Sequence, residues 1–234
     1  GWFKMKTGFV SIVGRPNVGK STLLNSILER KIAITSNVSG TTRNIIEGIY
    51  NDEDSQIVFI DTPGIHKPVN KLGNVMNSKA YTMLGEVDVV LFLLDVTKDF
   101  GKGDNFVLNK IKDTDKPVLL VLNKVDLIDK RKLLNIINKY KDLYDFKEII
   151  PVSSLKGDNV LDLINTIKKY LSEGEKYYTN EEVTNVTNGF YIAEIVREKL
   201  LWLTKSEVPH TVTCVMESYE EYEKYVDIGV LIIV

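Results

Sequence analysis

Hydrophobic residues along most of this chain gather in short continuous runs that are separated by amphipathic segments. Five runs are rich in β-branched residues and nearly free of polar positions: 9–13, 57–61, 89–95, 118–123 and 149–153. Around them, apolar residues recur at spacings of three and four near 20–30, 74–85, 103–113, 130–144 and 159–171. The runs are typical of strands buried on both faces of a parallel sheet, and the second pattern predicts helices. The alternation predicts a doubly wound α/β sheet with right-handed crossovers.

One more strand is predicted before the second buried run. The segments I-I-E-G-I-Y at 45–50 and Q-I-V-F-I at 56–60 flank the polar stretch N-D-E-D-S, which is typical of a hairpin. The hairpin would add an antiparallel edge strand. We therefore expect a mostly parallel sheet of six strands.

The pattern changes after residue 171. Residues 172–189 are polar, contain two glycines and show little periodicity, which predicts a linker. An amphipathic helix over 190–203 and strand-like runs at 211–217 and 228–234 follow. Such a short segment is too small to form a hydrophobic core of its own, so it predicts the N-terminal part of a second domain. We expect a first domain over 1–171, a linker over 172–189 and an incomplete second domain over 190–234.

Composition is that of an ordinary soluble globular protein, with 234 residues, 44% hydrophobic and 26% charged. The net charge of −2 gives no overall attraction to nucleic acid, so such binding would need a local basic surface. The single cysteine, Cys214, excludes an intramolecular disulfide and a cysteine-rich metal site in this chain. No apolar run reaches the roughly 18 residues of a spanning helix, and we expect a cytoplasmic protein.

The segment G-R-P-N-V-G-K-S at 14–21 joins the first predicted strand to the first predicted helix. A phosphate-binding P-loop needs this context, because its glycines let backbone N–H groups approach phosphate oxygens at the positive end of a helix. Lys20 would reach the β- and γ-phosphates, and Ser21 would bind Mg²⁺ through its hydroxyl. The alternative, a glycine-rich turn with a chance Lys-Ser pair, is disfavoured by the flanking strand and helix. The residues expected at the phosphates are Gly14, Arg15, Pro16, Asn17, Val18, Gly19, Lys20, Ser21 and Thr22.

The tetrapeptide D-T-P-G at 61–64 ends the second buried run, about forty residues after the P-loop. Asp61 would hold Mg²⁺ through a water, and the N–H of Gly64 would meet the γ-phosphate. Thr62 and Pro63 would lie beside the nucleotide with them. A proline turn without nucleotide contact is the alternative, which the placement after a buried strand disfavours.

The segment N-K-V-D at 123–126 ends the fourth buried run and lies where a base would be bound. When ionised, Asp126 can only accept hydrogen bonds, so it suits the adjacent N1–H and N2–H₂ donors of guanine, whereas adenine offers no such pair. Asn123 would bond the N7 edge and tie this loop to the P-loop, and the Lys124 stem would cover the base. With Val125 beside them, these residues favour a guanine nucleotide.

A further motif, V-S-S-L-K at 152–156, follows the last buried run. It would offer a backbone N–H, which we assign to Ser154, to guanine O6. Ser153 and Leu155 would flank it at the base. Alone this motif is weakly specific, but the four motifs in this order at strand ends indicate a guanine-nucleotide site strongly.

The polar segment 35–44, T-S-N-V-S-G-T-T-R-N, lies between the first helix and the hairpin, where a nucleotide-sensing loop is expected. We expect the Thr42 hydroxyl at Mg²⁺ and its N–H at the γ-phosphate. Thr41 is the alternative, and a polar loop without nucleotide contact stays open from these residues alone.

Together the motifs resemble the Era family of bacterial GTPases. The resemblance is carried by the P-loop, by T-T-R at 41–43, and by D-T-P-G-I-H-K-P at 61–68 with L-G-x-x-M-N at 72–77. It continues in A-E-I-V-R-E-K-L at 193–200 and in E-V-P-H at 207–210, which resemble the entry to the family's C-terminal KH domain. It thus covers essentially the whole chain.

The resemblance implies a Ras-like P-loop fold and a monomeric, Mg²⁺-dependent GTP-hydrolysing switch in small ribosomal subunit assembly. It also implies that a KH domain holds the 3′ end of small-subunit ribosomal RNA, and that some of the protein associates peripherally with the inner membrane. Two features differ from the family pattern: Gly40 replaces a glutamine before T-T-R, and no G-x-x-G, the KH loop that clamps nucleotides, follows residue 190. The chain stops at the second KH strand, so we expect weak or no binding of ribosomal RNA.

Ile65 stands where many GTPases carry the glutamine that orients the attacking water, and its side chain cannot hydrogen-bond a water. Phosphoryl transfer needs an aligned water and neutralised charge, which the backbone at Thr42 and Gly64, with Lys20 and Mg²⁺, would supply. Asn17 has two interpretations that stay open, a ligand of K⁺ between the phosphates and a turn residue that tolerates unusual backbone angles. We expect slow GTP hydrolysis that does not depend on Ile65.

Two functions of different classes stay open. One is a GTPase that couples its nucleotide state to ribosome assembly. The other is a guanine-nucleotide-dependent RNA-binding or scaffold module whose hydrolysis is incidental. An ATP-using P-loop kinase is disfavoured by N-K-V-D. Multiple-turnover phosphate release with and without ribosomal subunits separates the first two.

Overall fold

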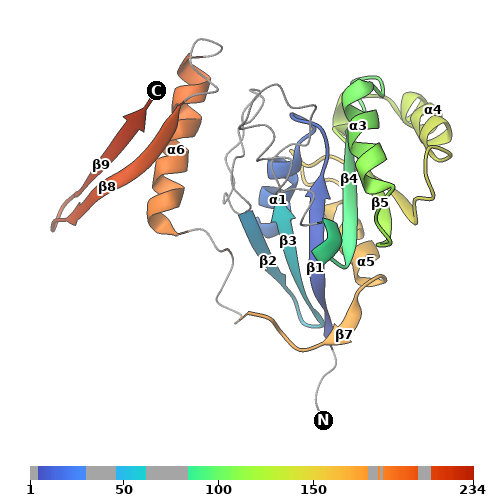
Figure 1. The fold of residues 1–234 in the computed structure, drawn as a ribbon, viewed down its shortest axis with the longest axis horizontal. Helices are drawn as coiled ribbons and strands as arrows, with labels where there is room; N and C mark the ends of the chain where they lie inside the picture. Colours follow the sequence, from blue (N-terminus) through green and yellow to red (C-terminus); the bar gives the residue numbers. More distant parts are fainter. Residues whose placement is uncertain (1–4, 30–45, 62–83, 179–183, 185–186, 205–211) are drawn as a thin grey trace.

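The central element of the structure is a mostly parallel sheet of seven strands (Figure 1). This computed structural model describes residues 5–29, 46–61, 84–178, 184, 187–204 and 212–234. The strand order is β2-β3-β1-β4-β5-β6, with β7 beside β1, and along the main path all pairings except β2–β3 are parallel. The strands are β1 (Met5–Val13), β2 (Ile46–Asn51), β3 (Ser55–Asp61), β4 (Val89–Asp95), β5 (Val118–Asn123), β6 (Glu148–Val152) and β7 (Ser172–Gly174).

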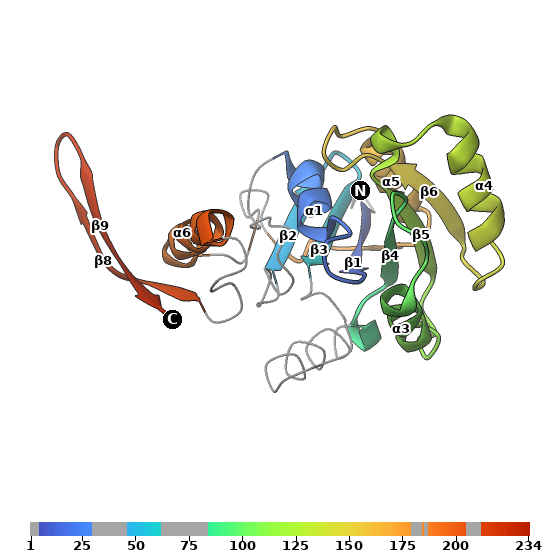
Figure 2. The same cartoon turned by 90° about the horizontal axis from the view of Figure 1, so that it is seen from above.

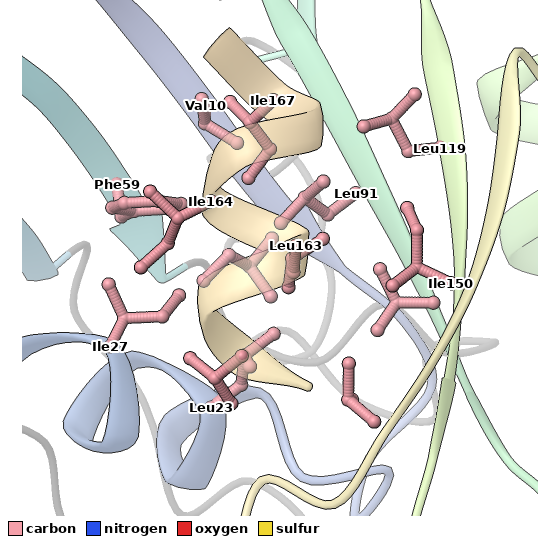
Figure 3. Close-up of a cluster of buried hydrophobic side chains, with 14 of the residues drawn as sticks. Val10, Leu23, Ile27, Phe59, Leu91, Leu119, Ile150, Leu163, Ile164 and Ile167 are labelled. Carbon is pink, nitrogen blue, oxygen red and sulfur yellow. The ribbon is translucent and has the colours of Figure 1, made fainter. Parts of the chain in front are cut away.

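Helices cover both faces of this sheet, as the near-continuous apolar runs predicted (Figure 2). On one face α1 (Lys20–Leu28) and α5 (Val160–Lys168) pack over the strands, and Figure 3 shows Leu23 of α1 and Leu163 of α5 among the buried side chains. On the other face lie α3 (Lys102–Ile111) and α4 (Lys130–Tyr140). The doubly wound α/β fold is confirmed. Of the helix expected over 74–85, the described residues include only the end.

The β2–β3 hairpin forms as predicted, with Ile46 opposite Asp61 and Asn51 opposite Gln56. Its turn is fixed by Asp52, which accepts hydrogen bonds from the Ser55 hydroxyl at 2.7 Å and from Lys168 of α5. The Lys168 ammonium also bonds Asp54 at 2.7 Å. The hairpin turn is therefore attached to the helical layer and does not project freely.

The prediction of six strands was wrong by one strand, β7. Its residues pair antiparallel with the beginning of β1, from Met5 opposite Gly174 to Thr7 opposite Ser172. The neighbouring strand β4 pairs with β1 only from Val10 onward, so the backbone groups of Met5–Thr7 would lack partners on that side. Because all three residues of β7 are exposed and none is apolar with a side chain to bury, the segment carries no apolar pattern and was assigned to the linker.

The chain remains attached to the sheet beyond β7, through Gln56 of β3. Its fully buried carboxamide accepts hydrogen bonds from the backbone N–H groups of Tyr177 and Tyr178 at 2.7 and 3.0 Å. Its Nε2 donates to the Tyr178 carbonyl oxygen at 2.9 Å and to Asn51 Oδ1 at 2.8 Å. Residues 172–178 therefore belong structurally to the sheet, and the linker predicted over 172–189 began too early.

A smaller helix-and-hairpin unit follows (Figure 1). It consists of α6 (Asn188–Thr204) and the antiparallel strands β8 (Thr213–Glu221) and β9 (Val226–Ile233). Ala193 of α6 is buried with Val212 and Cys214, and Val230 of β9 packs against them. Most of the remaining hairpin surface is exposed. None of the helices in the described ranges has the length and apolar character needed to cross a bilayer.

Candidate nucleotide-binding site

The loop between β1 and α1 owes its shape to glycines and left-handed backbone angles. Gly19 has φ of +101°, and a Cβ added there would lie 2.2 Å from Asn123 Nδ2. At Gly14 an added Cβ would meet the Leu93 carbonyl oxygen at 2.9 Å. Asn17 also has a positive φ, of 67°, which suits the turn-residue interpretation of its role. The loop thus packs on β4 and β5 so closely that two of its positions have no room for a side chain.

Lys20 begins α1 and turns its ammonium group back into this loop. Its side chain is buried, and Nζ donates to the carbonyl oxygens of Gly14 at 3.4 Å and Arg15 at 3.3 Å. Burial lowers the pKa of Lys20, while the Asp61 charge acts in the opposite direction. A cation held by two long hydrogen bonds can exchange them for phosphate oxygens, as a P-loop lysine must.

Ser21 and Asp61 meet at the other side of the loop. The Ser21 hydroxyl donates to Asp61 Oδ2 at 2.7 Å, and among the described residues nothing hydrogen-bonds the buried Oδ1 of Asp61. Burial raises the pKa of the Asp61 carboxyl to about 6, although Lys20 and Ser21 act in the opposite direction. A hydroxyl beside a buried carboxylate with an unpaired oxygen fits Mg²⁺, which takes few protein ligands when phosphates supply the others. The described ranges contain no cluster of three or more His, Cys, Asp or Glu residues that could hold a metal ion.

Asn123, at the end of β5, joins three loops through one buried carboxamide. Its Nδ2 donates to the Val18 carbonyl oxygen of the P-loop at 2.8 Å. Its Oδ1 accepts from the backbone N–H of Ser154 at 3.0 Å and from the Ser154 hydroxyl at 2.8 Å. The expected tie between N-K-V-D and the P-loop is present. The same carboxamide also fixes the loop after β6, which the sequence did not predict.

Lys124 makes a second tie, and its anionic partner, Asp95, was missed. The Lys124 ammonium donates to the Asn17 carbonyl oxygen at 3.0 Å and to Asp95 Oδ2 at 2.7 Å. Asp95 also accepts from the N–H and the hydroxyl of Thr97. Burial by itself would raise the pKa of Asp95, but these bonds hold it below its usual value. The only sequence signal for Asp95 is an acidic residue that ends a buried strand.

Asp126 is the middle residue of the 3₁₀ turn η1 (Val125–Leu127), and its carboxylate is nearly buried. Its Oδ1 accepts from the Ser153 hydroxyl at 2.7 Å, and Lys156 Nζ lies 4.0 Å from Oδ2. Because one oxygen is engaged by Ser153, the other is left to receive donors from a ligand. This arrangement suits the paired N–H groups of guanine.

The Ser154 N–H, which we assigned to guanine O6, donates to Asn123 Oδ1 at 3.0 Å. The next residue of this loop, Leu155, is 81% exposed. The assignment of a backbone donor from this loop to guanine O6 stays a prediction.

Arg15 extends from the P-loop to α3. Its Nε lies 2.9 Å from Oδ1 of Asp104, a carboxylate that is 2% exposed. The other oxygen, Oδ2, accepts from the Gly101 N–H at 2.9 Å at the start of the helix. The expected neighbours Pro16 and Thr22 belong to the same loop and to the first turn of α1.

The structure thus brings the P-loop, Asp61, the N-K-V-D segment and the loop 153–155 together at the carboxyl edge of the sheet. The expected residues Thr41, Thr42, Thr62, Pro63, Gly64 and Ile65 lie outside the described residues. Their assigned roles stay predictions.

The doubly wound fold, with these nucleotide-binding motifs at the carboxyl edge of its sheet, is that of a P-loop GTPase. A family model described as 50S ribosome-binding GTPase matches residues 9–124. A solved structure of Aquifex aeolicus Era bound to GDP and AlF4⁻ is 39% identical, covers 97% of this chain and 79% of that chain, and superposes with a TM-score of 0.91. A structure of Era with MgGDPNP and nucleotides 1506–1542 of 16S ribosomal RNA is 40% identical, covers 97% and 78%, and has a TM-score of 0.92.

The chain belongs to the Era family of GTPases, and it hydrolyses GTP. The FeoB G-domain from Methanococcus jannaschii, 24% identical over 71% of this chain and 98% of that chain with a TM-score of 0.52, shares the fold alone.

Proposed function

We propose that this protein is a slow GTP-hydrolysing switch in small ribosomal subunit assembly that binds ribosomal RNA, weakly in this chain, through its C-terminal unit. One observation supports the proposed nucleotide switch most directly. The Asn123 carboxamide joins the P-loop to the base-binding loop within one network of hydrogen bonds. Base and phosphate contacts are then made by a single connected framework. The RNA part is supported by the similar Era protein whose structure includes 16S ribosomal RNA.

The nucleotide would be held at both ends by residues of known geometry. Asp126 and a backbone N–H of the loop 153–155 would bind guanine, Lys124 would lie along the base, and the P-loop N–H groups with Lys20 would bind the phosphates. Ser21 and Asp61 would hold Mg²⁺, which supplies positive charge at the β- and γ-phosphates when it is bound. The described residues contribute positioning and charge, so the expected hydrolysis is slow.

The C-terminal unit supports the RNA proposal through its architecture, one helix packed on an antiparallel hairpin. We assign it to a KH-type domain because α6 contains the A-E-I-V-R-E-K-L segment on which the family resemblance rests. A cytoplasmic location, peripheral association with the inner membrane and a monomeric state belong to the same proposal and rest on the family resemblance.

The deciding experiment is multiple-turnover phosphate release from GTP by the full chain, with and without purified small ribosomal subunits. The proposal expects slow turnover that subunits accelerate, and subunit binding that differs between GDP and a non-hydrolysable GTP analogue. If subunit binding is the same in both nucleotide states while turnover is unchanged, the alternative of an RNA-binding scaffold with incidental hydrolysis is correct. Asp126→Ala, which should abolish nucleotide binding, controls for a contaminating GTPase.

A further inference from the structure

A basic groove lies between the loop after β4 and the helix α4, on the face of the sheet that α3 and α4 cover. It is open to solvent and has a volume of about 190 Å³. Val96 and Ile136 contribute apolar wall, and Tyr140 is buried beneath it. Its polar lining consists of Thr97, Lys98, Asp99, Lys132, Asn135 and Lys139.

The walls of this groove are fixed by contacts between them. The Tyr140 hydroxyl of α4 accepts a hydrogen bond from the Phe100 N–H at 3.1 Å, and the two rings lie 5.7 Å apart. On the loop side, Thr97 donates to Asp95 through both its N–H and its hydroxyl. At the start of α4, Asp129 accepts from the Lys132 N–H at 2.7 Å. The groove is therefore formed before any ligand arrives.

The lining is rich in donors that the fold does not use. The ammonium groups of Lys98 and Lys132 form no ion pair or side-chain hydrogen bond with the described residues, and Lys139 Nζ lies 5.6 Å from the Tyr140 ring centroid. Asp99 is the one carboxylate in the lining. Lys132 and Lys139 lie two helical turns apart, about 10 Å along α4, so they can reach different anionic groups.

We propose that this groove binds the phosphodiester backbone of RNA, as a second contact beside the C-terminal unit. Exposed ammonium groups keep their hydration, and such groups bind polyanions mainly by releasing condensed counterions. Lys130 and Arg131, both exposed, continue the positive surface along the helix. The inference rests on the proposed ribosomal RNA partner, and it provides the local basic surface that a chain of net charge −2 requires.

RNA is favoured over the two other sources of phosphate. A small phosphate ligand is normally enclosed by buried donors, whereas the lysines here are exposed around an open groove. A membrane surface is flat, and the concave lining would lie away from it. The A-form backbone presents successive phosphates to a row of cations. The groove is also distinct from the nucleotide site, because its lining includes none of the residues expected at the nucleotide. Asp95, which bonds both Thr97 on the groove wall and Lys124 at the P-loop, links the two.

The test compares the full chain, Lys132→Ala/Lys139→Ala and the control Lys112→Ala/Lys169→Ala, which removes two exposed lysines elsewhere. Binding of a fluorescent 16S-type RNA hairpin is measured from about 50 to about 250 mM KCl, and GDP affinity verifies folding. The groove variant should bind RNA roughly tenfold more weakly, and its slope of log affinity against log salt should fall by about 1.8. The control should resemble the wild type.

Four results would overturn the inference. Equal RNA binding by the groove variant and the wild type would exclude the groove as an RNA contact. Loss of binding to vesicles of phosphatidylglycerol and phosphatidylcholine, with RNA binding unchanged, would assign the groove to the membrane. Binding of inorganic phosphate by the wild type but not by the groove variant, with RNA binding unchanged, would assign the groove to a small anion. If the wild type binds no RNA at any salt, this inference and the RNA part of the proposed function both fail, while GTP turnover is still decided separately.

Discussion

The carboxamide of Gln56 holds the main chain of Tyr178 on both sides, receiving its N–H at 3.0 Å and donating to its carbonyl oxygen at 2.9 Å. This exchange resembles the bonding between paired strands, but one partner is a side chain. Tyr178 also donates from its hydroxyl to Glu47 of β2 at 2.9 Å. The chain is therefore held beside β2 and β3 at Tyr178, and Thr184 pairs again with Gly48 of β2.

Replacing Gln56 by Ala should release residues 177 and 178 without disturbing the nucleotide site. Three hydrogen bonds to this segment are lost, so we expect the free energy of unfolding to fall by about 3 kcal/mol. Hydrogen exchange at the Tyr177 and Tyr178 amides should become fast. Tyr178→Phe, which removes only the hydroxyl bond to Glu47, should keep both amides protected. Retained protection in Gln56→Ala would contradict the role of this side chain.

Gly19→Ala should abolish GDP binding. The new methyl group would lie 2.2 Å from Asn123 Nδ2, in a backbone conformation with φ of +101° that alanine rarely adopts. The matched control is Gly85→Ala, where no atom lies within 4 Å of an added Cβ. Isothermal titration with GDP should show no binding for the first variant and wild-type affinity for the second. Near-normal binding by Gly19→Ala would mean that Asn123 can move away at little cost.

Asp126→Asn should shift nucleotide preference from guanine toward xanthine, which presents a carbonyl at C2. Because the Ser153 hydroxyl donates to one side-chain oxygen, the new amide is expected to keep its oxygen there and to point its NH₂ group at the base. We expect GTP affinity to fall by at least tenfold, on the order of 1–3 kcal/mol for an unpaired buried polar group. Competition between GTP and XTP measures this, and full GTP affinity in the variant would disprove the base-binding role.

Asp61 and Asp95 should affect stability in opposite directions as pH changes. The folded-state pKa of Asp61 is raised to about 6, so the folded protein holds a proton that the unfolded chain releases between about pH 4 and 6. The contribution of Asp61 to the free energy of unfolding therefore falls as pH rises from about 4 to about 6. Asp61→Asn should therefore stabilise the nucleotide-free protein near pH 7.5, by at most about 3 kcal/mol, and have little effect near pH 4.

The pKa of Asp95 is lowered, so its contribution is present at neutral pH and is lost as pH falls through its folded-state value. Asp95→Asn should destabilise the protein near pH 7.5, where Lys124 would lose its anionic partner. Urea unfolding at both pH values measures the two effects. The same sign of change in both variants at neutral pH would contradict this account.

Asn17 provides a test of the proposed K⁺ site. Its φ of 67° is readily adopted by glycine, so Asn17→Gly removes the side chain without backbone strain and leaves the carbonyl that Lys124 binds. If the side chain holds K⁺ between the phosphates, wild-type GTP turnover should be faster in KCl than in NaCl, and the variant should lose the difference. Equal wild-type rates in both salts would remove K⁺ from the mechanism. Ile65→Ala should leave turnover nearly unchanged.

The sequence by itself determined the fold class and the order of the motifs. Apolar runs such as 89–95 and 118–123 can be buried only within a sheet covered on both faces, so a local pattern was sufficient. The same holds for Gly14, Gly19 and Lys20, because a P-loop between a strand and a helix is defined by consecutive residues. Asp126 was predicted from its chemistry, because an ionised carboxylate accepts hydrogen bonds and donates none, which suits the two N–H donors of guanine.

Only the tertiary structure decided which groups the site residues bind. The strand β7, the Gln56–Tyr178 contact and the Lys124–Asp95 ion pair each join residues that are distant in sequence. The donation of the Ser154 N–H to Asn123 likewise joins the loop after β6 to the end of β5. A hydrophobic pattern specifies which face of an element is buried, but a polar group accepts whichever partner the fold brings within hydrogen-bond distance. These partners therefore became known only when the strands were placed side by side.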